Sequence, residues 1–277
     1  MWMCCWPERT VNVRNRAIAV VAAAVAVGVT MVPTAHASVD SFCSELGAAW
    51  DGTTCTAVVK SQREAEMLLS LKLPSQLMDN PTAGPVLRDY YTRLFNGWRN
   101  TGNTTPRDSS ASADYEILGG PGGVQSVVVH EMFQPFGIQP NNAFRSFVFD
   151  MNAGRRLYRP DLFRPGTNAD QAVSAAAAPI LPPVLDAAAP PHTPGTYPFT
   201  VAEFQPDSAG PGYSGNYRAF ALTGDSLRLY MPDQPMLREN PTPPDRRVWS
   251  MDGGAVVANV PLASLAGSLR SEYGGGT

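Results

Sequence analysis

The stretch "DYEILGGPGGVQSVVVHEMF", residues 114–133, decides the fold that this sequence predicts. Its two ends, 114–120 and 124–133, have the composition of β-strands, and "GPGG" between them has the residues of a hairpin loop. A third run, "AFRSFVFDM" (143–151), alternates with a period of two and is largely apolar on both faces. Two apolar faces are typical of a strand in the middle of a sheet, so we expect this third strand to be central.

The rest of the chain adds further strands and helices. The predicted strands lie at 55–61, 65–74, 216–232 (two strands around a turn) and the start of 254–269. The predicted helices are an amphipathic helix at 85–100, a helix at 168–189 that Pro179 and Pro182-Pro183 kink or end, and a short helix near Pro261. Because strands and helices do not alternate strictly, this order favours an α+β fold, with mainly antiparallel sheets and a few packing helices, over a doubly wound fold.

The first 37 residues have the features of a secretory signal peptide. Three arginines precede an uncharged run of 13 residues (17–29), and "AHA" at 35–37 places a cleavage site between Ala37 and Ser38. Thirteen helical residues rise only about 20 Å, less than the roughly 30 Å of a bilayer core. We therefore predict a secreted chain without a transmembrane span after cleavage. The alternative is an uncleaved N-terminal anchor.

The mature chain is expected to form two lobes. An N-terminal lobe (38–112) holds a cysteine loop, strands and the amphipathic helix, and a C-terminal α+β lobe (113–270) holds the other elements. The boundary rests on "NTGNTTPRDSSASA" (100–113), whose small polar residues are typical of a linker or exposed loop. Residues 271–277 are expected to be a flexible tail.

Composition excludes several classes of partner. The signal segment removes three arginines and one glutamate, which leaves 18 basic and 23 acidic residues and a net charge of −5. That balance argues against nucleic acid or an anionic membrane surface as the main partner. The sequence has no phosphate-cradling loop, dinucleotide fingerprint or set of metal ligands, so we expect neither a cofactor nor a metal ion.

Cys43 and Cys55 are the two cysteines that remain after the signal segment, which carries Cys4 and Cys5. An even number of cysteines in an exported chain predicts a disulfide. The bond between Cys43 and Cys55 would close a small loop and stabilise the fold by about 2–3 kcal/mol.

The string Gly-Asp-Ser-Leu at 224–227 occurs in a large group of lipases and esterases, where its serine is the nucleophile. Ser226 would need a base, but no histidine follows His192, so the late Asp-x-x-His of those enzymes is absent. Residues 223–226 also have the Gly/Asp chemistry of a hairpin turn between two strands. We interpret the string as a turn.

His130 is the one candidate for a catalytic base, because His192 lies between prolines in a connector where we expect it to be solvated. A serine esterase would need a sequence-distant serine beside His130. The simpler interpretation is a strand histidine, partly covered or hydrogen-bonded, on the same face as Val128 and Met132. We therefore predict no catalytic set.

The segment "GRRLYRPDLFRPG" (154–166) gathers four arginines. These side chains would suit a bound anion. We favour solvated charges with Asp150 and Asp161 nearby.

Several stretches, in the same order along the chain, resemble one known family. They are "FCSELGAAWDGTTC" (42–55), "FVFDMNAGRRLYRPDLFRPGTN" (147–168), "YRAFALTGDSLRLYMPDQPMLRE" (217–239) and "AVVANVPLASL" (255–265). Together they are similar to the secreted mycobacterial immunogenic protein MPT-sixty-four family, which shares the extracellular domain of unknown function of lysozyme-sensing anti-sigma factors. Relatives often carry a histidine in the loop where this chain has Gly137-Ile138-Gln139-Pro140, so no role of that histidine transfers.

The resemblance implies a secreted or cell-wall-associated α+β protein of the kind known as exported antigens, with ester hydrolysis proposed for some members. It supplies no secure catalytic set. We therefore expect an extracellular binding or interaction module whose partner is an extracellular protein or a cell-envelope component. The alternative is a weak carboxylic-ester hydrolase that uses a serine with His130.

Overall fold

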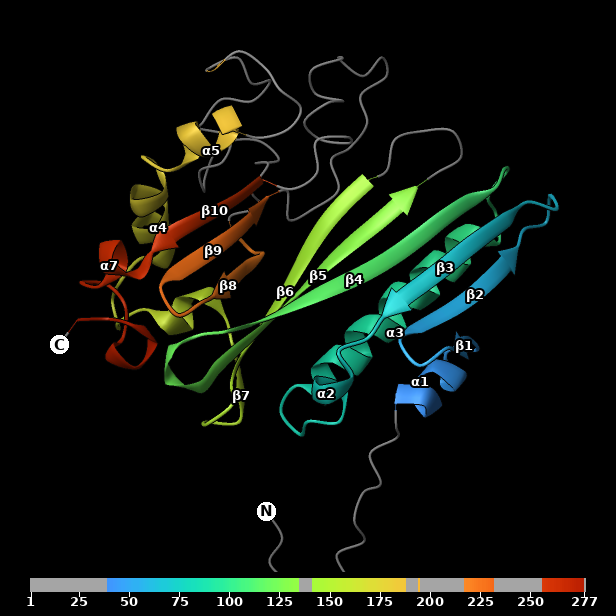
Figure 1. Ribbon diagram of the computed structural model, residues 1–277, viewed down its shortest axis with the longest axis horizontal. Coiled ribbons are helices and arrows are strands. Elements are labelled where there is room, and N and C mark those ends of the chain that lie inside the picture. Colours follow the sequence, from blue (N-terminus) through green and yellow to red (C-terminus); the bar gives the residue numbers. More distant parts are fainter. Residues whose placement is uncertain (1–38, 135–140, 188–193, 195–216, 232–255, 277) are drawn as a thin grey trace, which may run out of the picture. The chain divides into compact units, whose positions relative to one another are not determined.

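The computed structural model describes residues 39–134, 141–187, 194, 217–231 and 256–276, all within the unit His36–Thr277 (Figure 1). The predicted signal peptide, with its cleavage site at Ala37 and Ser38, lies outside the described residues. None of the helices in these ranges has the length and hydropathy that a membrane-crossing helix requires.

A seven-stranded sheet, with its strands in chain order, is the largest element among the described residues. The strands are β1 (Ala49–Trp50), β2 (Thr54–Lys60), β3 (Glu66–Lys72), β4 (Ser109–Gly119), β5 (Val124–Gln134), β6 (Asn141–Asp150) and β7 (Arg155–Leu157). Every neighbouring pair is antiparallel except β3 and β4, which are parallel because the helix α3 (Gly84–Gly102) carries the chain back between them. The mainly antiparallel α+β prediction is confirmed.

The helix α3 covers one face of this sheet (Figure 1). The apolar stripe of the helix, with a period of about 3.6 residues, packs against the apolar side chains of the strands, which alternate with a period of two. In β3, Met67, Leu69 and Leu71 are buried, whereas Leu68 on the opposite face is 55% exposed. The buried side chains of α3 belong to the same core as this face of β3. They are Leu87, Tyr91, Phe95 and Trp98. The short helices α1 (Val39–Glu45) and α2 (Ser75–Met78) contribute to the same core.

The strand β4 begins at Ser109, inside the segment predicted to be a linker. Residues 109–113 pair with Met67–Leu71 of β3, so the linker prediction is wrong for this part. Ala111 and Ala113 are buried on the α3 side while serines alternate with them, an alternation that the small polar composition concealed. Strands from both predicted lobes therefore share one sheet.

The glycine-rich hairpin loop between β4 and β5 is confirmed and contains a short 3-10 turn, Pro121–Gly123. Gly122 and Gly123 adopt φ values of 68° and 75°, which glycine reaches at no steric cost. A Cβ atom on Gly122 would also collide with the carbonyl oxygen of Glu272, so the C-terminal segment packs directly on this loop.

A second, three-stranded antiparallel sheet lies on the other side of β5 and β6. It consists of β8 (Phe220–Leu222), β9 (Ser226–Met231) and β10 (Val256–Pro261), in the order β10-β9-β8. The helices α4 (Ala169–Ala177), α5 (Leu181–Ala187) and α7 (Leu262–Leu265) share its core, and the short 3-10 turn Arg159–Leu162 leads into this region. Val128 and Phe144 of the large sheet contact Ala221 and Tyr230 of the small one.

Two serine hydroxyls join the edge of β8 that no described strand pairs with to the large sheet. Ser126 Oγ accepts a hydrogen bond from the Leu222 amide at 3.0 Å. Ser146 Oγ accepts one from the Phe220 amide at 2.9 Å and donates to the Arg218 carbonyl at 3.2 Å. Main-chain groups on the outer edge of β8 are thus satisfied by side chains of β5 and β6.

The prolines in the predicted helix at 168–189 act differently from one another. The helix begins as expected, because Asn168 Oδ1 accepts from the Gln171 amide at 3.1 Å, and α4 ends two residues before Pro179. The sequence predicts that Pro182 and Pro183 kink or end the helix, but they lie in the first turn of a second helix, α5. Proline is tolerated there because first-turn amides have no intrahelical acceptor.

The predicted disulfide is confirmed. Cys43 of α1 and Cys55 of β2 are bonded, with their Cα atoms 5.6 Å apart, and both are fully buried. At the other end, the flexible-tail prediction is wrong for the described residues 271–276. Ser271–Tyr273 form a 3-10 turn, and the buried Tyr273 hydroxyl donates to Asp150 Oδ2 at 2.9 Å.

Candidate functional site

His130 lies on β5, on the sheet face opposite α3, with its ring half-buried. Its Nε2 is 2.7 Å from Asn142 Oδ1, and its ring stacks on Phe144 with a centroid separation of 4.7 Å and an angle of 7°. An amide oxygen accepts hydrogen bonds, so Nε2 is the donor in this contact. Among the described residues, no serine hydroxyl is hydrogen-bonded to this ring.

The cross-strand neighbour of His130 on β4 is Asp114, which is bound to Lys72 Nζ at 2.6 Å. Partial burial favours the neutral carboxyl group, but the hydrogen bond and charge of Lys72 outweigh it and lower the pKa of Asp114. The Asp114 carboxylate is therefore ion-paired with Lys72 and is not shown bonded to His130. His130 is therefore a hydrogen-bonded strand histidine. Among the described residues, no serine is hydrogen-bonded to it as ester hydrolysis would require.

Ser226, in the Gly-Asp-Ser-Leu string, closes a hairpin turn. The Thr223 amide donates to the Ser226 carbonyl at 2.8 Å, and the two hydroxyl oxygens are 2.7 Å apart. Leu222 pairs with Leu227 across the turn, so the turn interpretation is confirmed. Ser226 is 7% exposed, and the other sequence candidate, His192, lies outside the described residues.

The four arginines of 154–166 do not form one anion site. Arg159 is buried against Asp170, Arg164 donates from Nε to the Leu269 carbonyl at 2.9 Å, and Arg155 lies beside Tyr273. Arg156 points toward Phe147 instead. The expectation of solvated charges is therefore wrong for Arg159, whose guanidinium is buried and paired.

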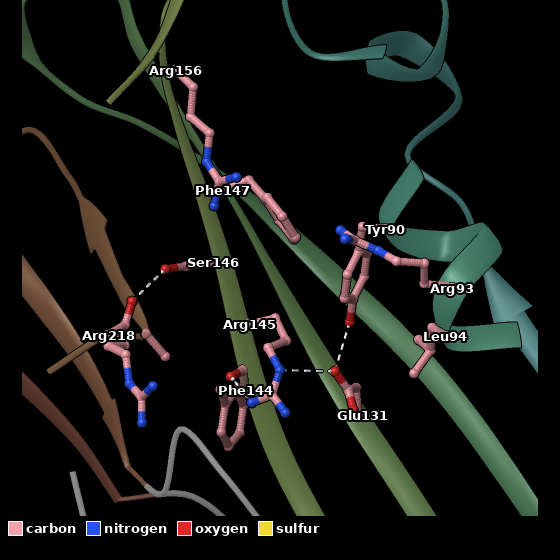
Figure 2. A pocket seen from close by; sticks show the side chains of 11 residues that line it. Tyr90, Arg93, Leu94, Glu131, Phe144, Arg145, Ser146, Phe147, Arg156 and Arg218 are labelled. Atoms are coloured by element: carbon pink, nitrogen blue, oxygen red, sulfur yellow. Dashed lines mark hydrogen bonds and ion pairs between the residues drawn. The ribbon is translucent and has the colours of Figure 1, made fainter. Parts of the chain in front are cut away.

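A pocket of about 690 Å³ opens along the edge of β6 (Figure 2). Four consecutive residues of β6, Phe144–Phe147, line it. Successive side chains of a strand point to opposite faces, so a pocket that touches all four lies along the edge of the strand. We call this pocket the β6 groove.

The walls of the β6 groove come from the elements that cover the two faces of β6. Figure 2 shows one wall formed by side chains of α3 and the other by the segment just before β8. The α3 wall consists of Tyr90, Arg93 and Leu94, the opposite wall of Arg218 and Ala219, and Glu131 and Arg156 complete the lining. Five separate segments of the chain therefore contribute.

The groove lies where β6 lacks a neighbouring strand on one side. Within the described ranges, β7 pairs only with Val148–Asp150, and the earlier residues of β6 have β5 alone as a strand neighbour. Arg145 Nη1 donates to the Phe144 carbonyl at 2.9 Å, which identifies Phe144 as a residue whose main chain faces outward. Every second residue of an antiparallel strand has the same orientation, so the N–H and C=O of Ser146 also face the groove.

Positive charge is concentrated in the groove, although the mature chain is net acidic. Four arginines line it: Arg93, Arg145, Arg156 and Arg218. Glu131 is the one carboxylate among the described lining residues, and it is already engaged. Its Oε1 accepts from the Tyr90 hydroxyl at 2.8 Å and lies 3.2 Å from Arg145 Nε.

Arg156 packs against two aromatic rings and has no ion pair within the part of the chain that the structure describes. Its guanidinium carbon is 4.9 Å from the Phe147 ring centroid and 4.8 Å from that of Tyr158. Its Nε is buried and has no hydrogen-bond partner among the described residues. A buried donor of this kind costs about 1–3 kcal/mol, and a bound anion would remove that cost.

Sequence reasoning missed most of this groove. It noted Arg156 only as one of several arginines, and it did not identify Arg93, Glu131 or Arg218. One signal was present: Arg145 interrupts the apolar face that Phe147 and Phe149 share on a predicted strand. A charged side chain on such a face indicates a specific partner or a functional role.

No family model matches this sequence. No curated protein matches it either. Among solved structures, a DUF3298 family protein from Pseudomonas aeruginosa is similar over 81% of this chain and 95% of that one, with 12% identity and a TM-score of 0.45. A DUF3298 family member from Bacteroides fragilis is similar over 79% and 92%, with 11% identity and a TM-score of 0.44. The resemblance to the MPT-sixty-four family stays a prediction.

Proposed function

We propose that this chain is a secreted or cell-wall-associated binding module without catalytic activity, and that the β6 groove is its contact surface. The observation that carries the proposal is that four arginines, against the single carboxylate of Glu131, line a strand edge that no described strand pairs with, in a chain that is net acidic. Clefts lined by one sign of charge attract ligands of the opposite sign.

The buried disulfide supports an extracellular setting, because disulfides persist in oxidising compartments. By its sequence resemblance, the chain is of the mycobacterial antigen type, and its partner is an extracellular protein or a cell-envelope component. The groove adds that the partner presents negative charge.

The esterase alternative has less support than the binding function. The ring of His130 is committed to Asn142 and Phe144, and its neighbour Asp114 is committed to Lys72. A hydrolase needs a nucleophile, a base and oxyanion donors that converge on one point. The described residues around His130 supply a base alone.

The test is binding of envelope extract and of lysozyme to immobilised residues 38–277, measured as a saturation curve. The groove variant combines Arg93→Gln and Arg156→Gln, which remove two charges without leaving a buried carboxylate unpaired. The control, Arg63→Gln, removes one arginine charge from an exposed turn outside the groove. We expect saturable binding by the wild type and the control and at least a tenfold loss in the groove variant. Absence of saturable wild-type binding would contradict the binding function, and equal binding by all three proteins would contradict the groove.

A further inference from the structure

Resting on the binding function proposed above, we infer the chemical class of the ligand. It is an extended peptide segment that carries carboxylate side chains at alternate positions. The peptide adds as an extra strand along the part of β6 that has β5 as its one strand neighbour among the described residues. The inference joins two properties of the β6 groove, its exposed main-chain groups and its arginines.

The main chain of β6 supplies the first argument. Among the described strands, β7 pairs with the outer edge of β6 only at Val148–Asp150, and the groove begins at Phe147, the residue just before Val148. A peptide in the groove would therefore continue the line of β7 along β6. There the N–H and C=O of Ser146 and the N–H of Phe144 face outward and can pair with it, as in other cases of strand addition.

The side chains supply the second argument. Alternate side chains of an added strand point to opposite faces, so every second one faces the α3 wall. Arg145 and Arg156 lie on that side together with Arg93, as Figure 2 shows. Arg145 already pairs with Glu131 and Arg93 with Asp89, whereas no ion pair of Arg156 is present among the described residues. The planar guanidinium group of Arg156 can match a carboxylate with two parallel hydrogen bonds, which favours glutamate or aspartate at the peptide position that faces it.

A second copy of this chain fits the groove less well than an acidic peptide. If two β6 edges paired, the arginines of one groove would lie against those of the other. Like charges placed opposite each other across paired strands are destabilising. Charge repulsion therefore disfavours pairing of two β6 grooves and favours an acidic partner.

The experiment uses fluorescence anisotropy with a labelled heptapeptide, Thr-Glu-Val-Glu-Val-Glu-Thr, and purified residues 38–277. Two further peptides carry N-methyl groups, either on the three glutamates or on the two valines. In an added strand only one of these sets of N–H groups faces β6, so we expect one methylated peptide to bind like the parent and the other to lose binding at least tenfold. Arg156→Gln should weaken the parent peptide about tenfold, because a hydrogen bond to a charged group is lost, whereas Arg63→Gln should not.

The outcomes separate this inference from the function on which it rests. Equal binding of both methylated peptides would show recognition of charge alone, and loss of both would also overturn strand addition. A peptide with lysines in place of the glutamates that binds as tightly would overturn the acidic specificity. Concentration-dependent dimerisation that the groove variant abolishes would identify a second copy as the occupant and overturn the peptide. If the extract contains a groove-dependent partner but none of the peptides binds, the binding function stands and this inference fails.

Discussion

Tyr90 on α3 donates its hydroxyl hydrogen to Glu131 Oε1 on β5, 2.8 Å away, and so joins the helix to the sheet beside the groove. Burial, together with the charge and hydrogen bond of Glu131, raises the pKa of Tyr90 far above its ordinary value of 10.0. The phenol therefore stays protonated and donates at any physiological pH. Tyr91, the next residue, is fully buried, and its hydroxyl has no hydrogen-bond partner among the described residues.

We expect Tyr90→Phe to destabilise the protein by about 1–2 kcal/mol, because Glu131 loses a donor in a largely buried position. Urea denaturation at pH 7 measures this free energy of unfolding. Tyr91→Phe is the matched control, and it should be neutral or slightly stabilising because it removes a buried hydroxyl that pairs with nothing described. Equal destabilisation by the two substitutions would contradict the role given to the Tyr90–Glu131 bond.

The contrast between these tyrosines shows what the sequence predicts and what it leaves open. The spacing of Leu87, Tyr91, Leu94 and Trp98 predicted the buried face of α3, and all but the partly buried Leu94 are buried there. The alternation in β3 predicted the face that meets it, because burial follows the period of each element. The position of Tyr90 at the margin of that face gave no indication of Glu131. Glu131 lies 41 residues further along the chain, and the pairing of β5 in the sheet brings it beside Tyr90.

The same limit explains the central-strand prediction for 143–151. Both faces of β6 are covered, one by α3 and the other by the small sheet, as its apolar composition indicates. Its outer edge, however, is paired only at Val148–Asp150 in the described ranges. The alternation of side chains along a strand predicts which faces of the strand are buried. It does not predict whether a second strand pairs with the main chain along the edge.

Ser126→Ala tests the hydroxyl link between the two sheets. Ser126 is fully buried, and its Oγ accepts from the Leu222 amide at 3.0 Å, so the alanine variant leaves that amide without its acceptor. We expect a loss of about 1–3 kcal/mol in the free energy of unfolding, measured with urea. Ser112→Ala, on the same sheet face but without a hydrogen bond in the described structure, should change stability by less than about 0.5 kcal/mol.

Asp150 gives the fold an acid-sensitive contact. Its burial favours the neutral form, but hydrogen bonds from the Ala153 amide, the Tyr273 hydroxyl and the Asn152 amide outweigh burial and lower its pKa below 3.8. A pKa that is lower in the folded state than in the unfolded state stabilises the fold above about 3.8, and this stabilisation is lost as the pH falls through the folded value.

We therefore expect the urea midpoint of the wild type to fall as the pH drops from 5 to 2. Asp150→Asn should lower stability by about 1–3 kcal/mol at pH 7 and fall less steeply with acid. Glu45→Gln, at an exposed carboxyl group, is the control and should follow the wild-type profile. A profile of Asp150→Asn parallel to that of the wild type would exclude Asp150 as a source of the acid sensitivity.

The Cys43–Cys55 bond should stabilise the fold by about 2–3 kcal/mol through closure of a short loop in the unfolded chain. Thermal unfolding with and without dithiothreitol measures this contribution. Reduction should lower the melting temperature of the wild type, and the double variant Cys43→Ala, Cys55→Ala should melt low under both conditions. If reduction left the wild type unchanged while the bond was demonstrably broken, loop closure would not be a source of stability here.

We predict no esterase activity, because His130, the one candidate base, is hydrogen-bonded through Nε2 to Asn142 and stacked on Phe144. A base in this setting has no described serine from which to take a proton, so we expect p-nitrophenyl butyrate to be hydrolysed no faster than the uncatalysed background. His130→Ala should leave that rate unchanged, since no base is lost from a working pair. A fluorophosphonate probe, which reacts covalently with activated serines, should leave the protein unlabelled. Labelling of one serine, with hydrolysis abolished by His130→Ala, would establish the esterase instead of the binding module.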